Sequence, residues 1–503
     1  MNNGYLIICL YLNIKAHMTH KVKINNVFFY IILFFSTILY LNQVRNFEFY
    51  NDDFTMLEFR DRNYLIVFFQ TDAWWRPLKN IFYNYFNNNY YELAFPIVAT
   101  KIIIHSFLTF FIFKFLKNFT NNINTIILTL IFFFSQSGII AVVGVDTLGQ
   151  LLVVFFGLIS FFFTYHFIKN KNNYYLFLSF IFILFSFLAK EIAITFVFIN
   201  LFTIFFYSNF NFLFKFSNVS YKKVILITFL YFLLVVSYLY FRNYIGATWQ
   251  PTNFGEDRYS LGLGFNLIKN IFLYFLSLVS PIDNTIVFVS YYNKYYIIIF
   301  FLTIFFISLL YYLLKKFYEN FDSDTIFRFL LLILSSFPII LLNNIGELYT
   351  YTSVFFLIFF LIKIIPSNHN FILIGLLCAN IFSSLNKIKN IELISLQKNK
   401  IDVFLNSIKN EIYEKDIYVL FNNSKLKYSY YNLPSFDWIY PIFQFQKNFK
   451  KRYWLIFDNQ IIQTLPKDSI ILIKTFDSMD GKMFTSKNCV DFYYSQKKTI
   501  CNY

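Results

Sequence analysis

FLSFIFILFSFLAKEIAITFVFINLF, residues 177–202, contains only two charged residues, Lys190 and Glu191, and these are adjacent. The stretch joins two apolar segments, 173–189 and 191–207, each of a length that suits a membrane-crossing helix. The charged pair then lies at the turn between two spans. An ionisable side chain at membrane depth is costly unless it is paired or hydrated, so both residues are candidates for a functional site. The alternative is a hairpin turn exposed to water, where the charges carry no such cost.

The composition of the whole chain agrees with this interpretation. Of 503 residues, 58% are hydrophobic and only 14% are charged, whereas soluble domains carry roughly 25% charged residues. The chain is therefore predicted to be an α-helical polytopic membrane protein. Apolar runs long enough to cross roughly 30 Å of hydrocarbon occur about eleven times, near residues 26–42, 95–116, 123–144, 147–168, 173–189, 191–207, 223–242, 295–314, 326–342, 349–365 and 370–385.

The basic residues set the orientation of these spans. The formal net charge is +16, and Lys and Arg gather in short linkers such as 114–117 and 215–223, as expected of cytoplasmic loops. This distribution explains the charge without any binding to nucleic acid. Residues 1–25 are predicted to be cytoplasmic, with Met18 as an alternative start, and the first loop, 43–94, is predicted to lie outside.

One further segment, 263–280, decides on which side the chain ends. It contains Asn266 and Lys269 and fits a re-entrant or surface-lying helix better than a span. The transmembrane domain then covers residues 26–385, and residues 386–503 lie outside. If the segment does span the membrane, the C-terminal part is cytoplasmic instead.

Residues 386–503 have the composition of a small soluble domain. A helical pattern over 401–415 is followed by three short apolar runs separated by polar turns: IYVLF at 417–421, YWLIF at 453–457 and IILIK at 470–474. A helix followed by short strands predicts a small α/β domain.

The first outer loop is unusually polar for so apolar a chain. Asp52 and Asp53 follow the first span closely. Adjacent carboxylates repel each other, which raises the pKa of one of them and suits a general base or a pair that binds a divalent cation. A hydrated turn is the alternative, because Asn-Asp-Asp is common turn chemistry.

A helix is predicted to begin at Arg76-Pro77. Its apolar residues recur at helical spacing: Leu78, Ile81, Phe82, Tyr85 and Phe86. Its asparagines fall on the other side: Asn80, Asn84, Asn87 and Asn88. This pattern predicts an amphipathic helix lying along the membrane interface. The backbone N–H groups at its start, with Arg76 beside them, form an anion site that suits a lipid phosphate, and Trp74 and Trp75 are interpreted as interfacial anchors.

Other polar residues are predicted at the same outer face. Asp146 stands at the junction of two spans, and Arg242 and Glu347 stand at the outer ends of two others, so all three are site candidates. His105 is a further candidate, although a packed and hydrogen-bonded core histidine is the simpler interpretation inside an apolar span. Lys101, in the same span, has no obvious partner in the sequence.

In their order along the chain, these motifs resemble those of the GT-C superfamily of membrane glycosyltransferases. They are an outer Asp-Asp after the first span, an Arg-Pro-Leu that opens an interfacial helix, a His in the next span, an outer Asp before the fourth span, and Ala-Lys-Glu between two spans. The chain looks most similar to the protein O-mannosyltransferase-like branch, which includes the transmembrane and TPR-repeat proteins and their bacterial relatives. The similarity runs from residue 26 to about residue 365.

The resemblance implies that a sugar moves from a polyprenyl-phosphate-linked donor to a glycan, lipid or protein acceptor on the outer side of a bacterial inner membrane. It implies that Asp53 or Asp52 activates the acceptor hydroxyl, and that Arg76, Lys190 and Arg242 hold the donor phosphate as it leaves. Some members of the superfamily bind a divalent metal near such acids, and Asp52 and Asp53 would be its ligands here.

Two features depart from the family pattern. The relatives have Glu-Arg-Tyr where this chain has Glu347-Leu348-Tyr349, so an arginine is missing at this point or is supplied from elsewhere. The membrane region is followed by the predicted α/β domain instead of TPR repeats, and functions that depend on those repeats do not carry over.

Two other functions fit the same lipid-linked substrate. A polysaccharide polymerase or ligase typically has a long outer loop with Arg or His late in the chain, whereas the loop at 281–294 is short and has neither. A transporter of lipid-linked sugars is expected to have broken helices and buried charges near the bilayer midplane, often in two related halves. Here the charges gather at one face, and the sequence shows no internal repeat.

Overall fold

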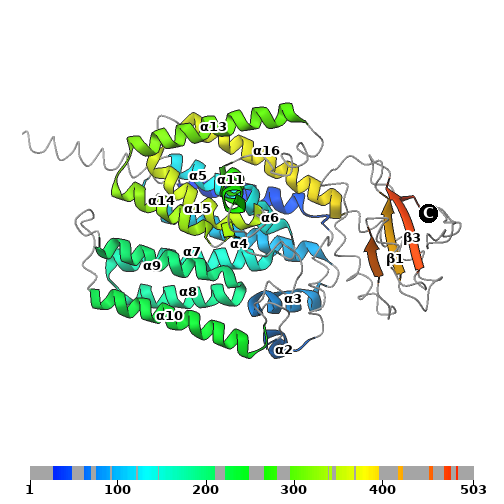
Figure 1. The fold of residues 1–503 in the computed structure, drawn as a ribbon, viewed down its shortest axis with the longest axis horizontal. Coiled ribbons are helices and arrows are strands. Elements are labelled where there is room, and N and C mark those ends of the chain that lie inside the picture. Colours follow the sequence, from blue (N-terminus) through cyan, green and yellow to red (C-terminus); the bar gives the residue numbers. More distant parts are fainter. Residues whose placement is uncertain are drawn as a thin grey trace, which may run out of the picture.

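The structure is a computed structural model, and it is mostly helical (Figure 1). It describes residues 26–47, 62–69, 75–90, 93–120, 123–144, 147–209, 221–247, 265–279, 295–337, 339–341, 347–366, 370–395, 417–422, 453–456, 470–476 and 483–484. The predicted N-terminal segment 1–25 and most of the first outer loop lie outside these residues.

The helices include one in each of the eleven apolar runs. After a first helix, Asn26–Gln43, they are α2 (Tyr64–Phe69), α3 (Pro77–Asn89), α4 (Ala94–Leu116), α5 (Ile123–Phe133), α6 (Gln136–Val143), α7 (Leu148–Asn170), α8 (Asn173–Ala189), α9 (Ile194–Asn209), α10 (Tyr221–Tyr244), α11 (Phe265–Val279), α13 (Tyr296–Glu319), α14 (Ser323–Ser336), α15 (Tyr351–Ile364) and α16 (Asn370–Ser395). Short 3-10 turns flank some of them: η2 (Glu191–Ala193), η4 (Ile339–Leu341) and η5 (Glu347–Thr350).

Length and composition identify the helices that suit a bilayer. Among the described residues, six helices are long and apolar enough to cross a membrane, and a seventh span results if α5 and α6 are one bent crossing. Segments 173–189, 191–207 and 348–364 form shorter apolar helices. The chain is therefore a multi-pass α-helical membrane protein.

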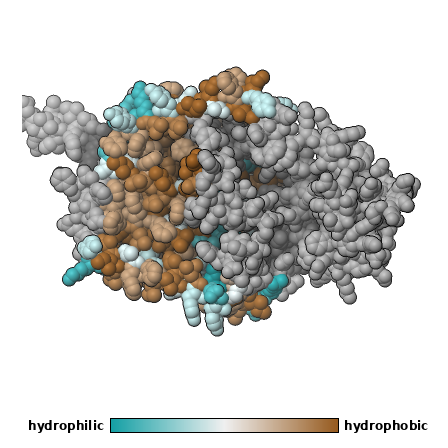
Figure 2. All heavy atoms as spheres, viewed as in Figure 1, coloured by the Kyte–Doolittle hydropathy of each residue, from teal (hydrophilic) through white to brown (hydrophobic). Residues whose placement is uncertain are grey.

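The outer surface of the helices is apolar, as expected of a protein in contact with lipid. Figure 2 shows hydrophobic side chains over most of the coloured surface. The exposed residues of α10 and α13 include Ile225, Phe229, Phe232, Val236, Ile297, Phe300, Phe301 and Ile304. Soluble monomers rarely expose apolar patches of this extent.

The basic linkers lie at one end of the helical bundle. Lys223, at the start of α10, donates a hydrogen bond of 2.6 Å to Asn173 at the start of α8. Lys363, in the last turn of α15, pairs with Asp322 just before α14 at 2.8 Å. Figure 1 shows these helix ends on the side of the bundle opposite α3.

Buried polar groups join the helices inside the bundle. The hydroxyls of Ser160 in α7 and Ser179 in α8 are 2.8 Å apart, and Ser179 is 2.9 Å from the Tyr231 hydroxyl of α10. Asn200 of α9 donates to Ser160 at 2.9 Å. Such hydrogen bonds hold membrane helices together where lipid removes the hydrophobic driving force between them.

The third apolar run is a broken helix, with α5 and α6 bent by 45°. The break leaves backbone carbonyls that must find donors in a region without water. His105 of α4 lies 3.1 Å from the Phe133 carbonyl, and Ser384 of α16 donates to the Phe134 carbonyl at 2.6 Å. Ser135 caps α6 by accepting from the Gly138 amide.

Four short strands are described after α16: β1 (Ile417–Asn422), β2 (Tyr453–Ile456), β3 (Ile470–Phe476) and β4 (Met483–Phe484). They form one sheet in the order β2-β1-β3-β4, in which β1 is parallel to β2 and β3. The three apolar runs predicted to be strands correspond to β1, β2 and β3. The helix predicted over 401–415 lies outside the described residues, so the α/β domain stays a prediction.

Candidate functional site

An ion pair joins Arg76 to Glu191. Arg76 precedes α3, and Glu191 opens η2 in the turn between α8 and α9. Nη2 of the guanidinium lies 2.6 Å from Oε1, and Nε lies 3.1 Å from Oε2. Burial alone would lower the pKa of Arg76, but the Glu191 carboxylate raises it above its ordinary value. Two parallel charge-assisted hydrogen bonds also fix the orientation of the guanidinium.

Lys190 lies at the same turn and contacts two further elements. Its Nζ donates to Oε1 of Gln150 in α7 at 3.0 Å and lies 5.5 Å from the centre of the Tyr349 ring in η5. A Cβ at Gly149 would lie 3.2 Å from the Ala189 carbonyl oxygen, 3.6 Å from Cδ of Lys79 and 4.0 Å from Cδ of Lys190. The side chains of Lys79 in α3 and of Lys190 therefore both pass close to Gly149.

Arg242, in the last turn of α10, is only 2% exposed. It lies beside Tyr238 and close enough to Glu191 and Arg76 to interact with the charges of both. The ring of Trp75 stacks on Tyr238 with 5.8 Å between the ring centres. Arg242 thus belongs to the same group of charges.

Trp75 is buried, which differs from the predicted interfacial anchor. It is 4% exposed, and its indole Nε1 donates to the Phe68 carbonyl at 2.8 Å. The Trp75 ring packs against α2 and α10 and forms one wall of the site. Trp74 lies outside the described residues.

These residues form what we call the outer polar cluster: Arg76, Lys79, Gln150, Lys190, Glu191, Tyr238, Arg242 and Tyr349. Four of them, Arg76, Lys190, Glu191 and Arg242, were predicted from the sequence as site residues, and the structure brings them together. Gln150 is recognisable in the sequence as a lone amide in an apolar span, whereas nothing in the pattern singles out Tyr238 or Lys79.

Two buried amides at this end of the bundle have polar atoms without a partner. Asn80 of α3 and Gln150 are each 1% exposed. Neither amide atom of Asn80, nor Nε2 of Gln150, has a hydrogen-bond partner among the residues that the structure describes. Because buried polar groups are nearly always satisfied, these atoms are suited to bind a ligand or water.

The orientation of α3 explains why Asn80 is buried. The helix forms where it was predicted, but its asparagine side packs against the protein: Asn80, Asn84 and Asn87 are buried. Tyr85, on the apolar side, is 48% exposed. In a protein surrounded by lipid, the polar side of a helix is directed inward and the apolar side outward.

Two buried cationic or titratable residues of α4 have structural partners. Lys101 donates to the Gly144 carbonyl and to Thr147 Oγ1, the latter at 2.7 Å, and so closes the turn between α6 and α7.

His105, in the same helix, is also buried and hydrogen-bonded. Its Nδ1 is 2.6 Å from the Tyr351 hydroxyl. Since the Phe133 carbonyl can only accept, Nε2 carries the proton and Nδ1 accepts from Tyr351. His105 is a packed core histidine, as its apolar surroundings in the sequence indicate.

The remaining predicted site residues are not placed by the structure. Asp52, Asp53 and Asp146 lie outside the described residues. Glu347 opens η5, but its side chain is not described. Within the described part of the chain, no group of three or more His, Cys, Asp or Glu residues could hold a metal ion.

No protein-family model, no curated protein and no solved structure matches this chain.

Proposed function

We propose that the protein is a membrane glycosyltransferase of GT-C type, which moves a sugar from a polyprenyl-phosphate-linked donor to an acceptor on the outer face of the membrane. The observation that carries the proposal is the convergence of Arg76, Lys190 and Arg242 around Glu191 at one end of the bundle. Cationic groups from three separate parts of the chain there can bind a phosphate at headgroup depth.

The reaction that such a site serves exchanges one C–O bond for another. The oxygen of the acceptor hydroxyl bonds to the anomeric carbon, and the bond from that carbon to the phosphate oxygen breaks with its electron pair on the phosphate. The hydroxyl proton passes to Asp53 or Asp52, a role that rests on the family resemblance. Negative charge grows on the leaving phosphate, and Arg76, Lys190 and Arg242 stabilise it.

Glu191 is a positioning residue in this scheme. It accepts two of the five N–H donors of the Arg76 guanidinium and thereby fixes the plane of that group. The two amide atoms of Asn80 and Nε2 of Gln150 suit uncharged hydroxyl groups, such as those of the sugar. Arg76 and Lys190 also interact with Tyr349, so cations are present beside the segment where the relatives have an additional arginine.

The orientation follows from the same proposal. Eleven crossings, with α11 lying in the membrane without adding one, place the basic linkers inside and the outer polar cluster outside. Residues 386–503 then lie outside, and the membrane is the inner membrane of a bacterial cell. A helix in every predicted apolar run and the shared end of the basic linkers support this arrangement.

Substitutions in a host that lacks its own copy of the gene test the activity. We expect Asp53→Asn or Asp52→Asn, together with Arg76→Gln and Arg242→Gln tested singly, to abolish one surface glycan. Glycans are compared at equal amounts of each variant in the membrane, because Arg76→Gln also breaks the ion pair with Glu191. Lys363→Gln, at the opposite end of the bundle, is the matched control and should restore the native glycan profile. If both Asp variants and both Arg variants also restore it, the proposal is wrong.

Transport of lipid-linked sugars is the second candidate, because the bend between α5 and α6 resembles the discontinuous helices of transporters. Reconstituted vesicles distinguish the two functions. Movement of a lipid-linked sugar between leaflets at the same rate in the native protein and in Arg76→Gln, without any transfer product, would favour transport.

A further inference from the structure

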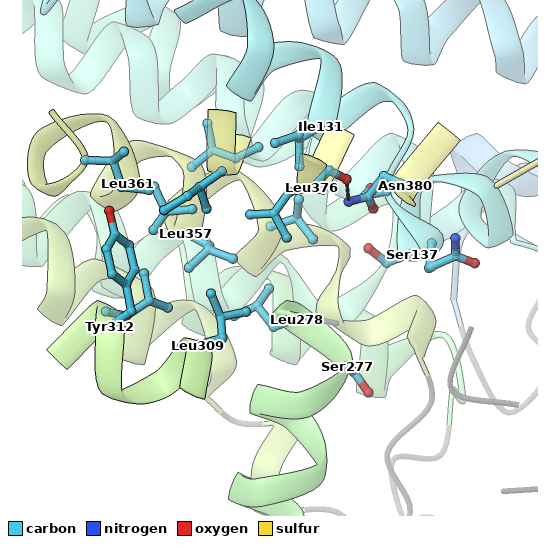
Figure 3. A pocket seen from close by; sticks show the side chains of 17 residues that line it. Ile131, Ser137, Ser277, Leu278, Leu309, Tyr312, Leu357, Leu361, Leu376 and Asn380 are labelled. Carbon is cyan, nitrogen blue, oxygen red and sulfur yellow. Dashed lines mark hydrogen bonds between the residues drawn. The ribbon is translucent and has the colours of Figure 1, made fainter. Parts of the chain in front are cut away.

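A groove separate from the outer polar cluster runs between α5, α6, α11, α13, α15 and α16. It is lined by 17 residues of these helices and of the segments beside them. Figure 3 shows Leu309, Leu357, Leu361 and Leu376 along its walls. These walls offer an elongated apolar surface inside the membrane region.

One end of the groove is polar. Gln136 and Ser137, at the start of α6, line it and are 4% and 3% exposed. In the described part of the chain, neither amide atom of Gln136 nor Oγ of Ser137 has a hydrogen-bond partner. Figure 3 shows Ser137 and Asn380 at this end of the groove. Buried hydrogen-bonding groups of this kind are expected to have a partner, and the groove is where a partner can reach them.

The residues that line the groove determine which chemical groups can bind in it. Every residue that lines the groove is uncharged, and none belongs to the outer polar cluster. A phosphate would find no cation here. A neutral acceptor, such as an ester carbonyl, suits the Gln136 amide, the Ser137 hydroxyl and the partial positive charge at the start of α6.

α13 forms the side of the groove nearest to the lipid. Leu309, Tyr312 and Leu313 of this helix line the groove, whereas Phe300 and Phe301 on the same helix are more than half exposed. The helix therefore stands at the surface of the bundle. A hydrocarbon chain can enter beside it directly from the bilayer.

We propose that the groove holds one acyl chain of a membrane glycerolipid, whose ester group is bound by Gln136 and Ser137. The apolar walls take the chain, and the unpartnered amide and hydroxyl take the ester oxygens. This site is independent of the donor site and does not require the glycosyltransferase activity.

Photolabelling of the full chain in nanodiscs tests the proposal. The probe is a phosphatidylglycerol with a diazirine in one acyl chain, and mass spectrometry locates the labelled residues. We expect labelling at Leu309, Leu357 and Leu376 to exceed that at Phe229 and Phe232, which lie on the lipid-exposed surface of α10.

Two variants test whether labelling depends on the groove and on its polar end. Gln136→Leu combined with Ser137→Ala removes no side-chain hydrogen bond with another described residue, so we expect the fold to be retained. Labelling of the groove should fall several-fold while labelling of α10 is unchanged. Leu376→Trp fills the groove and should have the same effect.

Three results would overturn the proposal. They are groove labelling no stronger than that of α10, labelling that is unaffected by both variants, and displacement of the label by excess polyprenyl phosphate. The last would identify the groove as a site for the chain of the donor instead.

Discussion

Nη2 of Arg76 lies 2.6 Å from Oε1 of Glu191, although the two residues are 115 positions apart in the sequence. The pair ties the start of α3 to the turn between α8 and α9, and its side chains are 17% and 18% exposed. Removing one partner leaves the other charge largely buried. We expect Glu191→Gln to lower the free energy of unfolding by about 3 kcal/mol, as measured by thermal unfolding of the purified protein.

The opposite end of the bundle provides a control for this effect. Lys363 pairs with Asp322 at a similar distance, but the two side chains are 32% and 50% exposed. Lys363→Gln should cost less than about 1 kcal/mol. The exchange of Arg76→Glu with Glu191→Arg should recover part of the stability. Equal losses in Glu191→Gln and Lys363→Gln would show that the buried pair has no special role.

Close packing between α7 and α9 depends on Gly157. A Cβ at this position would lie 2.2 Å from the ring of Phe196, so the Phe196 ring or one of the two helices must move if a methyl group is added. Gly157→Ala should destabilise the protein by about 1–3 kcal/mol. Thermal unfolding measures the effect, and adding Phe196→Leu should relieve it.

Gly375 of α16 is the matched control for this substitution, because a Cβ there meets nothing within 4 Å. Gly375→Ala should stabilise the helix by about 0.5–1 kcal/mol. A loss of stability in Gly375→Ala as large as that in Gly157→Ala would refute the packing argument.

The cap of α14 predicts a dependence of stability on pH. Burial would raise the pKa of Asp322, but hydrogen bonds from Lys363 and Thr325 outweigh it and lower the pKa below its ordinary value. The folded state therefore favours the carboxylate. The resulting stability is present above the ordinary pKa of about 3.9 and is lost as the pH falls through the lowered pKa.

Unfolding midpoints measured between neutral and acidic pH test this prediction. Asp322→Asn keeps a side chain that can cap the helix but does not titrate. The variant should lose less stability on acidification than the native protein does. Identical pH profiles would mean that Asp322 makes no contribution to the acid sensitivity.

Labelling of single cysteines tests the proposed orientation. In a background without the four native cysteines, an impermeant maleimide applied to intact spheroplasts should label Asn243→Cys, at the outer end of α10, and Ser424→Cys in the C-terminal segment. Lys222→Cys, at the start of α10, should be labelled only after the membrane is opened. If Ser424→Cys is protected while Asn243→Cys is labelled, α11 adds a crossing and the tail is cytoplasmic.

The sequence was sufficient to locate the helices, because each apolar run is long and ends at charged or turn residues. It also indicated that Arg76, Lys190, Glu191 and Arg242 share one face, since loop charge fixes which helix ends lie together. Residue spacing in the sequence does not show which side chains contact each other across the bundle. The partner of Arg76 is 115 residues away, and the partners of Lys101 lie at the turn between two other helices, α6 and α7.

The direction of the asparagine side of α3 was not predictable from periodicity alone. The helical pattern separates Asn80, Asn84 and Asn87 from the apolar residues, but it is the same whether the polar side faces water or protein. Burial of these residues follows from the packing of α3 against α7 and α8, which only the three-dimensional structure shows.

The bond from Ser384 to the Phe134 carbonyl joins residues 250 positions apart, and this has a consequence for biosynthesis. The carbonyl of Phe133 receives its donor from α4, which the ribosome has already made when α5 emerges. The carbonyl of Phe134 receives its donor from α16, which is the last of the described helices to be synthesised. A nascent chain that stops before residue 384 therefore keeps an unsatisfied carbonyl in hydrocarbon, a defect by which proteolytic quality control can distinguish truncated chains from finished ones.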